Sequence, residues 1–349
     1  MFDTGRSSQT YEFDLPRKAI KQPAADAVDL APHVGPGDIQ KAATKIQTYV
    51  RRTPLVQNRA LNDRFGTEVY LKLEVLQETG SFKVRGAFNK MLTLSDEEKR
   101  RGVVAVSGGN HAQAVAFAAK TLGCHALILM PEFTPETYVK RTRGYGADVE
   151  LFPSLTDAFA AAKEYEKVGR TLVHPFDDRA VIAGQGTIGL EILEDVPHVT
   201  DVILSVGGGG MAAGVAAAIK ATKPDVRIWG VETRGADSMA QALAADRVVE
   251  LPRITSVAKT LGAQAAGYLC FEMVREYLEG VTVVEDDEAL RELFFLLENA
   301  KVVTEPAASC TLAAAERLRG EFSSYSHVVI ILCGGNTGPE DLLEFKDRL

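Results

Sequence analysis

The sequence of 349 residues lacks several features that mark particular classes of protein. Its four cysteines (Cys124, Cys270, Cys310 and Cys333) lie far apart without a Cys-x-x-Cys pair, which argues against a zinc site or a disulfide framework. No apolar run reaches the roughly 18 residues of a membrane span, and the first residues lack the apolar segment of a signal peptide. The formal net charge of -8 is unfavourable for binding nucleic acid or an anionic membrane. We therefore expect a cytoplasmic protein with reduced thiols that binds neither nucleic acid nor an anionic membrane.

The residues that are present form the composition of an ordinary globular protein, with 46% hydrophobic and 25% charged residues. Short apolar segments alternate with helical patterns, which is typical of parallel βα units. Strands are expected over residues 69–73, 103–106, 126–130, 149–152, 171–173, 201–206, 227–231 and 328–333. Helices are expected over residues 37–50, 59–65, 112–122, 136–143, 155–168, 187–194 and 211–220. The expected fold is α/β, with two domains and a cleft at the carboxyl ends of the strands.

The two ends of the chain differ from this pattern. Residues 1–36 are polar, mixed in charge and contain four prolines, so we interpret them as an N-terminal arm. Only residues 337–349 follow Asn336, and no separate regulatory domain is expected there.

The segment Ser81-Phe82-Lys83-Val84-Arg85-Gly86-Ala87 places a lysine at the start of a helical pattern, after an apolar strand and a Gly-Ser corner. A helix N-terminus repels cations, and partial burial lowers the pKa of a lysine toward the range where the free amine can act. Such an amine can form a Schiff base with an aldehyde cofactor and then transfer protons. A surface lysine early in a helix has the same spacing, so the spacing does not decide between the two interpretations.

Two glycine-rich turns follow apolar strands and open helices, Ser107-Gly108-Gly109-Asn110-His111 and Val206-Gly207-Gly208-Gly209-Gly210-Met211. Glycine allows a ligand to approach the backbone, and free N–H groups at a helix start favour anions. The first turn suits a substrate carboxylate, although a plain βα turn with a capping asparagine explains it equally well. The second turn suits a phosphate.

The second turn also permits a nicotinamide-dinucleotide site. Gly207, Gly209 and Ala212 have the dinucleotide spacing, and Glu232 lies about 20 residues further on, at the end of the next strand, where a ribose-binding acid belongs. Taken alone, the segment leaves both interpretations open.

Together, these segments resemble the threonine/serine dehydratase and serine racemase family, a group of fold-type II pyridoxal phosphate (PLP) enzymes. The similarity extends over about residues 38–340 and includes the family's Ser-Phe-Lys-x-Arg-Gly-Ala segment, Ser-x-Gly-Asn-His loop and phosphate cup. It implies two parallel-sheet α/β domains with the active site in the cleft between them. Residues 37–99 and 173–349 would form the large PLP-binding domain, and residues 100–172 the small inserted domain.

The resemblance also implies roles for individual residues. Lys83 would hold PLP covalently and act as the catalytic base, with Phe82 near the ring. The substrate carboxylate would lie against Ser107, Asn110 and His111. The cofactor would contact Phe82, Lys83, Asn110, Gly207, Gly208, Gly209, Gly210, Met211, Glu305 and Cys333. Cys333 would face the pyridine nitrogen, although a buried cysteine at a strand end is a common structural feature.

Three places depart from the family's pattern. Gly108 stands where serine racemases have a second serine, the proton donor on the face opposite the lysine, so the dehydratases are the better match. Some members hold a divalent metal at positions matching Glu232, Ala236 (through its carbonyl) and Ser238. Ser238 lacks the charge that a hard cation prefers, so neither a divalent nor a monovalent cation is favoured as a cofactor. Residues 257–262 differ from the Ala-Asp-Gly that many members have here.

The function implied is PLP-dependent β-elimination of a β-hydroxy-L-amino acid, giving a 2-oxo acid and ammonia. Threonine, serine, phenylserine and 3-hydroxyaspartate are the candidate substrates. The alternatives are a PLP-dependent racemase, a β-replacement enzyme and a nicotinamide-dinucleotide-binding protein. The partner is a small amino acid, and a homo-oligomer is compatible with the sequence.

Overall fold

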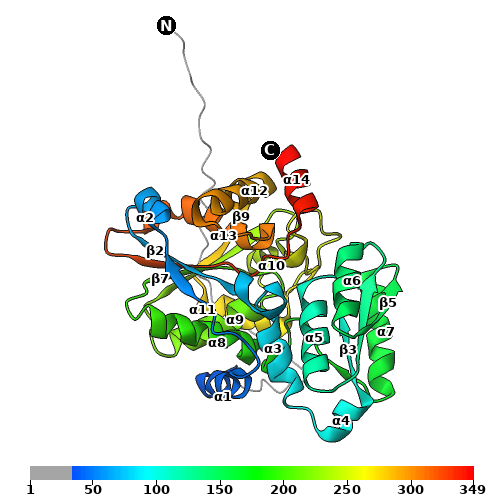
Figure 1. The fold of residues 1–349 in the computed structure, drawn as a ribbon. Helices are drawn as coiled ribbons and strands as arrows, with labels where there is room; N and C mark the ends of the chain where they lie inside the picture. The colour runs from blue at the N-terminus through cyan, green and yellow to red at the C-terminus, as the bar shows by residue number, and fades with distance from the viewer. Residues whose placement is uncertain (1–33) are drawn as a thin grey trace. The chain divides into compact units, whose positions relative to one another are not determined.

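Two β-sheets organise residues 34–349, which are the residues that this computed structural model describes (Figure 1). Neighbouring strands pair in parallel, except for the antiparallel pair β1 and β2 in the larger sheet. The larger sheet has the spatial order β1 (Leu55–Gln57), β2 (Glu68–Lys72), β10 (His327–Ile331), β7 (Asp201–Ser205), β8 (Arg227–Thr233) and β9 (Gly280–Val284). The smaller sheet has the order β5 (Asp148–Phe152), β4 (Ala126–Pro131), β3 (Val103–Val106) and β6 (Thr171–Leu172). The predicted α/β class is confirmed.

The helices mostly connect successive strands. They are α1 (Pro36–Ile46), α2 (Arg59–Phe65), α3 (Lys83–Met91), α4 (Asp96–Arg101), α5 (Asn110–Thr121), α6 (Glu136–Gly144), α7 (Leu155–Lys167), α8 (Arg179–Asp195), α9 (Gly210–Lys220), α10 (Ser238–Ala245), α11 (Tyr268–Tyr277), α12 (Asp286–Phe295), α13 (Pro306–Arg317) and α14 (Pro339–Asp347). The arm predicted over residues 1–36 lies outside the described residues, apart from its last three.

The smaller sheet is covered on both faces, as its central strand shows. Val103 and Ala105 of β3 pack in one hydrophobic core with residues of α5, whereas Val104 and Val106 pack in another with Ala158 and Ala162 of α7. In Figure 1, α5 and α7 flank β3. Because successive side chains of a strand point to opposite faces, a strand buried on both sides must be apolar throughout.

Helix α3 connects the two sheets, since it packs against both α5 and α8. Val84, Ala87, Phe88 and Met91 of α3 belong to the same core as β3 and α5. Residues of α3 therefore stabilise the smaller sheet, although they precede residue 100. The predicted domain boundaries stay a prediction.

Helix α8 begins well before the helix predicted over residues 187–194. The Asp178 carboxylate accepts hydrogen bonds from the N–H groups of Ala180 and Val181 and so caps the true start. The glycines that make this helix hard to recognise in the sequence allow close packing. A β-carbon on Gly186 would lie 2.8 Å from the Gly214 carbonyl oxygen of α9. The predicted start was wrong because these glycines allow close contact between helices, whereas the prediction treated them as part of a loop.

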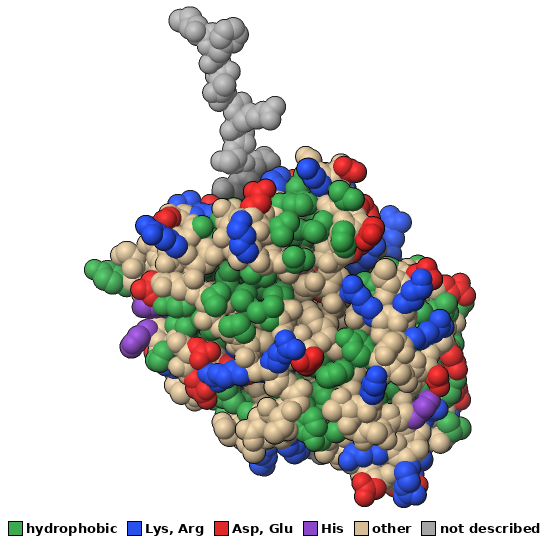
Figure 2. Space-filling model, in the orientation of Figure 1, with side chains coloured by type: hydrophobic (Ala, Val, Ile, Leu, Met, Phe, Trp, Pro, Cys, Tyr) green, Lys and Arg blue, Asp and Glu red, His purple; other side chains and the backbone are tan. Residues whose placement is uncertain are grey.

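One face of the molecule carries both kinds of charge. Figure 2 shows Lys and Arg side chains together with Asp and Glu side chains across that face, around a patch of hydrophobic side chains. This mixture differs from the continuous basic surface typical of a nucleic-acid-binding protein. Within residues 34–349, no helix combines the length and the hydrophobicity needed to cross a membrane.

Candidate active site

Lys83 and Cys333 lie far apart in the sequence, and the fold brings their segments together. The Phe82 N–H donates a hydrogen bond to the Cys333 carbonyl oxygen at 3.0 Å. Ser81 forms an isolated β-bridge with Gly334. Lys83, the first residue of α3, is therefore held beside the end of β10, and two of the predicted cofactor residues lie on adjacent segments.

The Lys83 amine has few polar neighbours. Its Nζ donates one hydrogen bond, to the Pro175 carbonyl oxygen at 2.8 Å, and lies 5.1 Å from the centre of the Phe82 ring. Burial lowers the pKa of Lys83 from its usual 10.5 to about 8, because desolvation disfavours the charged form. This is the direction that the sequence predicts for a lysine that reacts as a free amine.

The four-glycine turn forms a compact cradle at the start of α9. Gly207 (φ 56°) and Gly209 (φ 97°) have left-handed backbone angles that favour glycine. A β-carbon on Gly208 would lie 2.2 Å from the Phe176 ring, so only a glycine fits there. The first N–H groups of α9 have no partner within the helix and carry its positive dipole end. The turn can bind an anion such as a phosphate.

The surroundings of Glu232 argue against a dinucleotide site at this turn. The Glu232 carboxylate is buried and accepts hydrogen bonds from the N–H groups of Met239 (3.3 Å) and Ala240 (2.9 Å) at the start of α10. Burial raises its pKa to about 8. The residue thus stabilises α10 and is not exposed toward a ribose.

The same neighbourhood does not fit the divalent metal site of some family members. The Ser238 hydroxyl is buried without a hydrogen-bond partner in the described part of the chain, and Ala236, two residues earlier, is also buried. Glu232 is the only carboxylate of the three candidate positions. Residues 34–349 contain no group of three or more His, Cys, Asp or Glu side chains placed to hold a metal ion.

Asn110 and Glu305 form the centre of a buried hydrogen-bond network. The Asn110 amide nitrogen donates to both Glu305 oxygens at 2.9 and 3.0 Å. Glu305 also accepts from the Thr260 hydroxyl at 2.6 Å and from the Asn336 N–H at 2.9 Å. The Asn336 side chain donates to the Asn110 oxygen at 2.7 Å. The fold thus joins two predicted cofactor residues through two residues that were not predicted as site residues.

His111 is placed differently from its predicted role. Its Nε2 lies 2.8 Å from the Val173 carbonyl oxygen, which can only accept, so Nε2 carries the proton. Burial lowers the pKa of His111 to about 3, and the buried Nδ1 is left as an acceptor without a partner among the described residues. A neutral ring in this tautomer offers no N–H to a carboxylate, which argues against the predicted role of this side chain. The Ser107 hydroxyl accepts from the Gly109 N–H at 3.1 Å and stabilises the loop.

Cys333 has the surroundings of a neutral thiol. The Ser205 hydroxyl donates to its sulfur at 3.3 Å. Burial, with a smaller contribution from the charge of Glu305, raises the pKa of Cys333 to about 12. The thiol therefore stays protonated at physiological pH and presents no negative charge to a ligand.

The sequence did not identify Thr260, Asn336, Pro175 or Tyr138 as site residues. The Tyr138 hydroxyl, from α6, donates to the Asn336 carbonyl oxygen at 3.0 Å and links α6 to this network. Asn336 and Pro175 follow predicted strands, and the carboxyl end of a strand was the only available signal. Thr260 lies in residues 257–262, which depart from the family pattern.

Comparison with known proteins shows the family. Residues 46–334 match the model of the pyridoxal-phosphate dependent enzymes. The chain belongs to this family. The L-threonine ammonia-lyase of Thermotoga maritima is 44% identical over 301 residues, covering 86% of this chain and 75% of that protein. The catabolic L-threonine dehydratase of Staphylococcus aureus is 39% identical over 305 residues, covering 86% of this chain and 88% of that protein.

Solved structures of the family share the fold. Maize serine racemase superposes with a TM-score of 0.84 at 35% identity, covering 90% of this chain and 97% of that one. The T.th. threonine deaminase superposes with a TM-score of 0.82 at 37% identity, covering 87% of this chain and 99% of that one. The prediction of a fold-type II PLP enzyme is confirmed, PLP is the cofactor, and the chain is a PLP-dependent lyase.

The residues described above fit PLP chemically. The Lys83 amine, whose pKa is lowered by desolvation, suits the aldehyde. The Gly207–Met211 turn suits the phosphate, and the neutral Cys333 thiol suits an unprotonated pyridine nitrogen. The order of the segments also fits, because the three groups follow β2, β7 and β10, which lie next to one another in the larger sheet. These assignments of individual residues are proposals.

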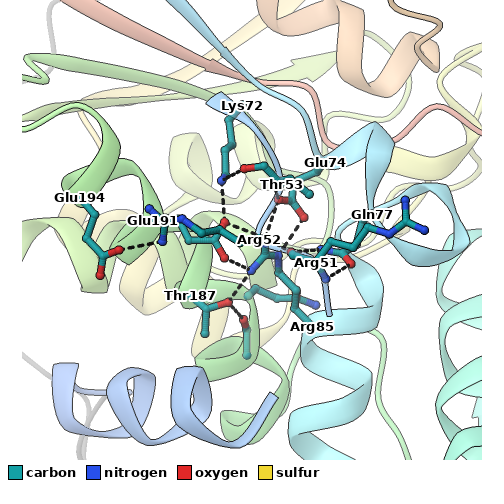
Figure 3. A network of polar contacts seen from close by, with 12 residues as sticks. Arg51, Arg52, Thr53, Lys72, Glu74, Gln77, Arg85, Thr187, Glu191 and Glu194 are labelled. Carbon is teal, nitrogen blue, oxygen red and sulfur yellow. Dashed lines mark hydrogen bonds and ion pairs between the residues drawn. The ribbon is translucent and has the colours of Figure 1, made fainter. Parts of the chain in front are cut away.

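A buried ionic cluster includes Arg85, which follows Lys83 by two residues in α3 (Figure 3). Arg85 is fully buried and donates to the Glu74 carboxylate at 2.9 and 2.8 Å and to Glu191 at 2.7 and 2.9 Å. Lys72, also fully buried, donates to Glu191 at 2.6 Å and to the Thr53 carbonyl oxygen at 2.7 Å. Two cations and two anions thus fix the first turn of α3 against α8 and the end of β2.

The pKa of Lys83 predicts how PLP uptake depends on pH. We expect the rate of PLP binding to the PLP-free protein to rise with pH and to level off above about 8, because only the neutral amine attacks an aldehyde. Stopped-flow absorbance across the pH range measures this rate. A rate that keeps rising toward 10.5, the usual lysine value, would show that Lys83 is not desolvated.

The glycine cradle predicts the effect of a single methyl group. Gly208→Ala places a β-carbon in contact with the Phe176 ring, and overpacking of this kind costs about 1–3 kcal/mol. The dissociation constant for PLP should therefore rise by roughly tenfold or more, as measured by fluorescence titration of the PLP-free protein. Gly320→Ala is the matched control, because a β-carbon there meets no atom within 4 Å. Equal affinities in the two variants would contradict the cradle.

Proposed function

We propose that this enzyme eliminates water from L-threonine, and from L-serine as a second substrate, to give a 2-oxo acid and ammonia. The observation that carries this proposal is the 44% identity with the L-threonine ammonia-lyase of T. maritima over 86% of the chain. Phenylserine and 3-hydroxyaspartate stay candidates, because nothing in the site described above selects against their side chains.

Lys83 supplies the proton transfer in this proposal. When bound, PLP draws electron density away from the α-carbon of the substrate and so makes its proton more acidic. The amine of Lys83, with a pKa of about 8, is available in its neutral form to remove that proton. The proton that Lys83 takes from the α-carbon balances the departing β-hydroxyl, so that one water leaves in total, and the released enamine hydrolyses in solution to the 2-oxo acid and ammonia. General-base catalysis of this kind contributes about 10²–10⁴-fold.

Cys333 supports elimination rather than a reaction through a long-lived carbanion. A carboxylate in its place would keep the pyridine nitrogen protonated and stabilise a full negative charge on the α-carbon. The Cys333 thiol, whose pKa is about 12, supplies no such charge. Elimination tolerates this, because the leaving hydroxyl accepts the electrons as the α-proton departs.

The start of α5 supports carboxylate binding by the backbone. Gly109 precedes the helix, and Asn110 and His111 are its first two residues, whose N–H groups have no partner within the helix. These groups can bind the carboxylate of an amino acid. Because the His111 side chain offers no N–H, the backbone carries this role in our proposal, together with the Ser107 hydroxyl.

Racemisation is the second candidate, because maize serine racemase is 35% identical to this chain. Racemisation requires an acid and a base on opposite faces of the α-carbon. Gly108, in the loop where the racemases are expected to have their second serine, has no proton to donate. We therefore rank elimination first.

The test is product analysis with purified holoenzyme. L-Threonine, L-serine, phenylserine and 3-hydroxyaspartate are supplied separately, 2-oxo acid and ammonia are measured, and D-serine is detected by chiral chromatography. We expect stoichiometric 2-oxo acid and ammonia, with the highest kcat/KM for L-threonine. D-Serine without 2-oxo acid would establish the racemase alternative, and no product from any of the four would overturn the proposal.

We infer a cytoplasmic location from the cysteine content and the charge of the sequence. A homo-oligomer is compatible with the chain and is tested by light scattering. The division into residues 37–99 with 173–349 and residues 100–172 is tested by limited proteolysis near residues 100 and 172.

A further inference from the structure

Thr134 lies in the turn between β4 and α6, and its side chain packs against the carboxylate loop. A β-carbon added to Gly108 would lie 2.5 Å from the Thr134 hydroxyl oxygen and 3.4 Å from the Pro131 side chain. The Thr134 N–H donates to the Pro131 carbonyl oxygen at 2.9 Å, which holds the turn in this position. Glycine at 108 is therefore required by a neighbouring side chain.

Backbone conformation does not explain this glycine. Gly108 is absent from the glycines of the described chain that have a positive φ, so an L-residue could adopt its backbone angles. The adjacent Gly109 is not restricted in this way, since its β-carbon would meet only the Thr260 methyl carbon, at an ordinary 3.6 Å. The restriction is specific to position 108 and originates from Thr134.

The Thr134 hydroxyl does not serve as a proton donor itself. Thr134 is only 9% exposed, and its hydroxyl oxygen has less than 1 Å² of accessible surface and no hydrogen-bond partner within residues 34–349. A group shielded in this way does not line the cleft. A buried hydroxyl without a partner is destabilising, so an alanine would be the better residue if packing stability were all that mattered here.

We propose that Thr134 is a specificity-determining residue that keeps every side chain out of position 108. This inference rests on the proposed elimination. The resemblance to the serine racemases implies that a serine at position 108 would supply a second acid to the α-carbon, and Thr134 occupies the space that its β-carbon needs. With that space filled, position 108 supplies no acid on the face opposite Lys83, and the reaction proceeds to elimination.

The test uses two double variants. Gly108→Ser is made alone, with Thr134→Ala, and with Thr142→Ala. Thr142 is the matched control, because it is a second buried threonine without a hydrogen-bond partner for its hydroxyl in the described chain, and it lies within α6. Each holoenzyme is assayed with L-serine for D-serine and for exchange of the α-proton in D₂O.

We expect D-serine and α-proton exchange from the Gly108→Ser/Thr134→Ala protein at a rate at least roughly tenfold above Gly108→Ser alone, which corresponds to about 1.4 kcal/mol of relieved strain. The Gly108→Ser/Thr142→Ala protein should match Gly108→Ser. Equal D-serine formation by all three proteins, or none from any of them, would overturn the proposal, because replacing Thr134 would then make no difference to proton transfer by a serine at position 108.

A second readout does not depend on turnover. Gly108→Ser should lower the Tm of the PLP-free protein, and Thr134→Ala should restore it, whereas Thr142→Ala should not. No restoration by Thr134→Ala would overturn the steric claim. If the unmodified enzyme forms no 2-oxo acid from threonine or serine, the proposed function fails on its own, and the Tm comparison still decides the contact between Thr134 and Gly108.

Discussion

Lys83→Ala is expected to reduce kcat for threonine deamination by at least about 10²–10⁴-fold, which is the contribution of a positioned general base. In our proposal, the variant also loses the amine that bonds to the cofactor. The protein should still fold, because the Lys83 amine makes one hydrogen bond, to the Pro175 carbonyl oxygen. Steady-state kinetics with saturating PLP measures the loss, and thermal unfolding of the PLP-free protein checks the fold.

Lys90→Ala is the matched control for this variant. Lys90 lies in the same helix and is partly exposed, and its amine forms an ion pair with Asp178 at 2.6 Å. Its removal should leave most of the activity. Full turnover by Lys83→Ala, or an equal loss of activity in both variants, would show that Lys83 has no specific catalytic role at the start of α3.

Arg85→Met is expected to lower the free energy of unfolding by about 3–5 kcal/mol, the usual cost of removing one partner of a buried ion pair. Burial opposes ionisation of Glu74, but the Arg85 guanidinium outweighs it and holds the pKa of that carboxyl below its usual range. Without Arg85, Glu74 would lose a bidentate partner in a site from which water is excluded. Urea unfolding of the PLP-free protein measures the change.

Arg52→Met provides the comparison, because Arg52 is near the same cluster but half exposed (Figure 3). Its ion pairs with Glu194 and Asp195 are accessible to water, and exposed pairs contribute about 0–1 kcal/mol. The two arginines should therefore differ by several-fold in their effect on stability. Similar effects would mean that burial does not control the strength of these ion pairs.

Much of the fold could be predicted from the sequence because hydrophobic periodicity determines it locally. The helix over residues 59–65 and the strand over residues 103–106 were predicted to the residue. In the strand, four consecutive apolar residues are buried on both faces of the smaller sheet, which is the pattern of a parallel sheet. The start of α8 was missed because its glycines contact α3 and α9, and such contacts are not encoded in local pattern.

The polar network of the site could be predicted only in part. Asn110, Thr260, Glu305 and Asn336 belong to four separate segments, and their hydrogen bonds depend on how those segments meet. The tautomer of His111 is set by the Val173 carbonyl, which no sequence motif reveals. Motif residues were found because their spacing reflects local geometry, whereas their partners were not.

The charged cluster around Arg85 is the clearest case of what sequence could not show. Charged residues are mostly exposed, so the sequence suggests a surface position for Lys72, Glu74 and Arg85. Instead these three side chains are fully buried. Their burial follows from mutual pairing across three segments, with Glu191 of α8 as the fourth member. Arg85 belongs to the Ser81–Ala87 motif, but its ion-pair partners could not be recognised from the sequence.

The central claim is that Lys83 carries the cofactor of a β-eliminating enzyme. The most direct measurement is reduction of the PLP-loaded protein with borohydride, followed by proteolysis and mass spectrometry of the labelled peptide. We predict one phosphopyridoxyl group per chain, attached to Lys83, with loss of the visible absorbance band and of threonine turnover. Labelling of a different lysine, or a protein that takes up no PLP, would contradict the claim.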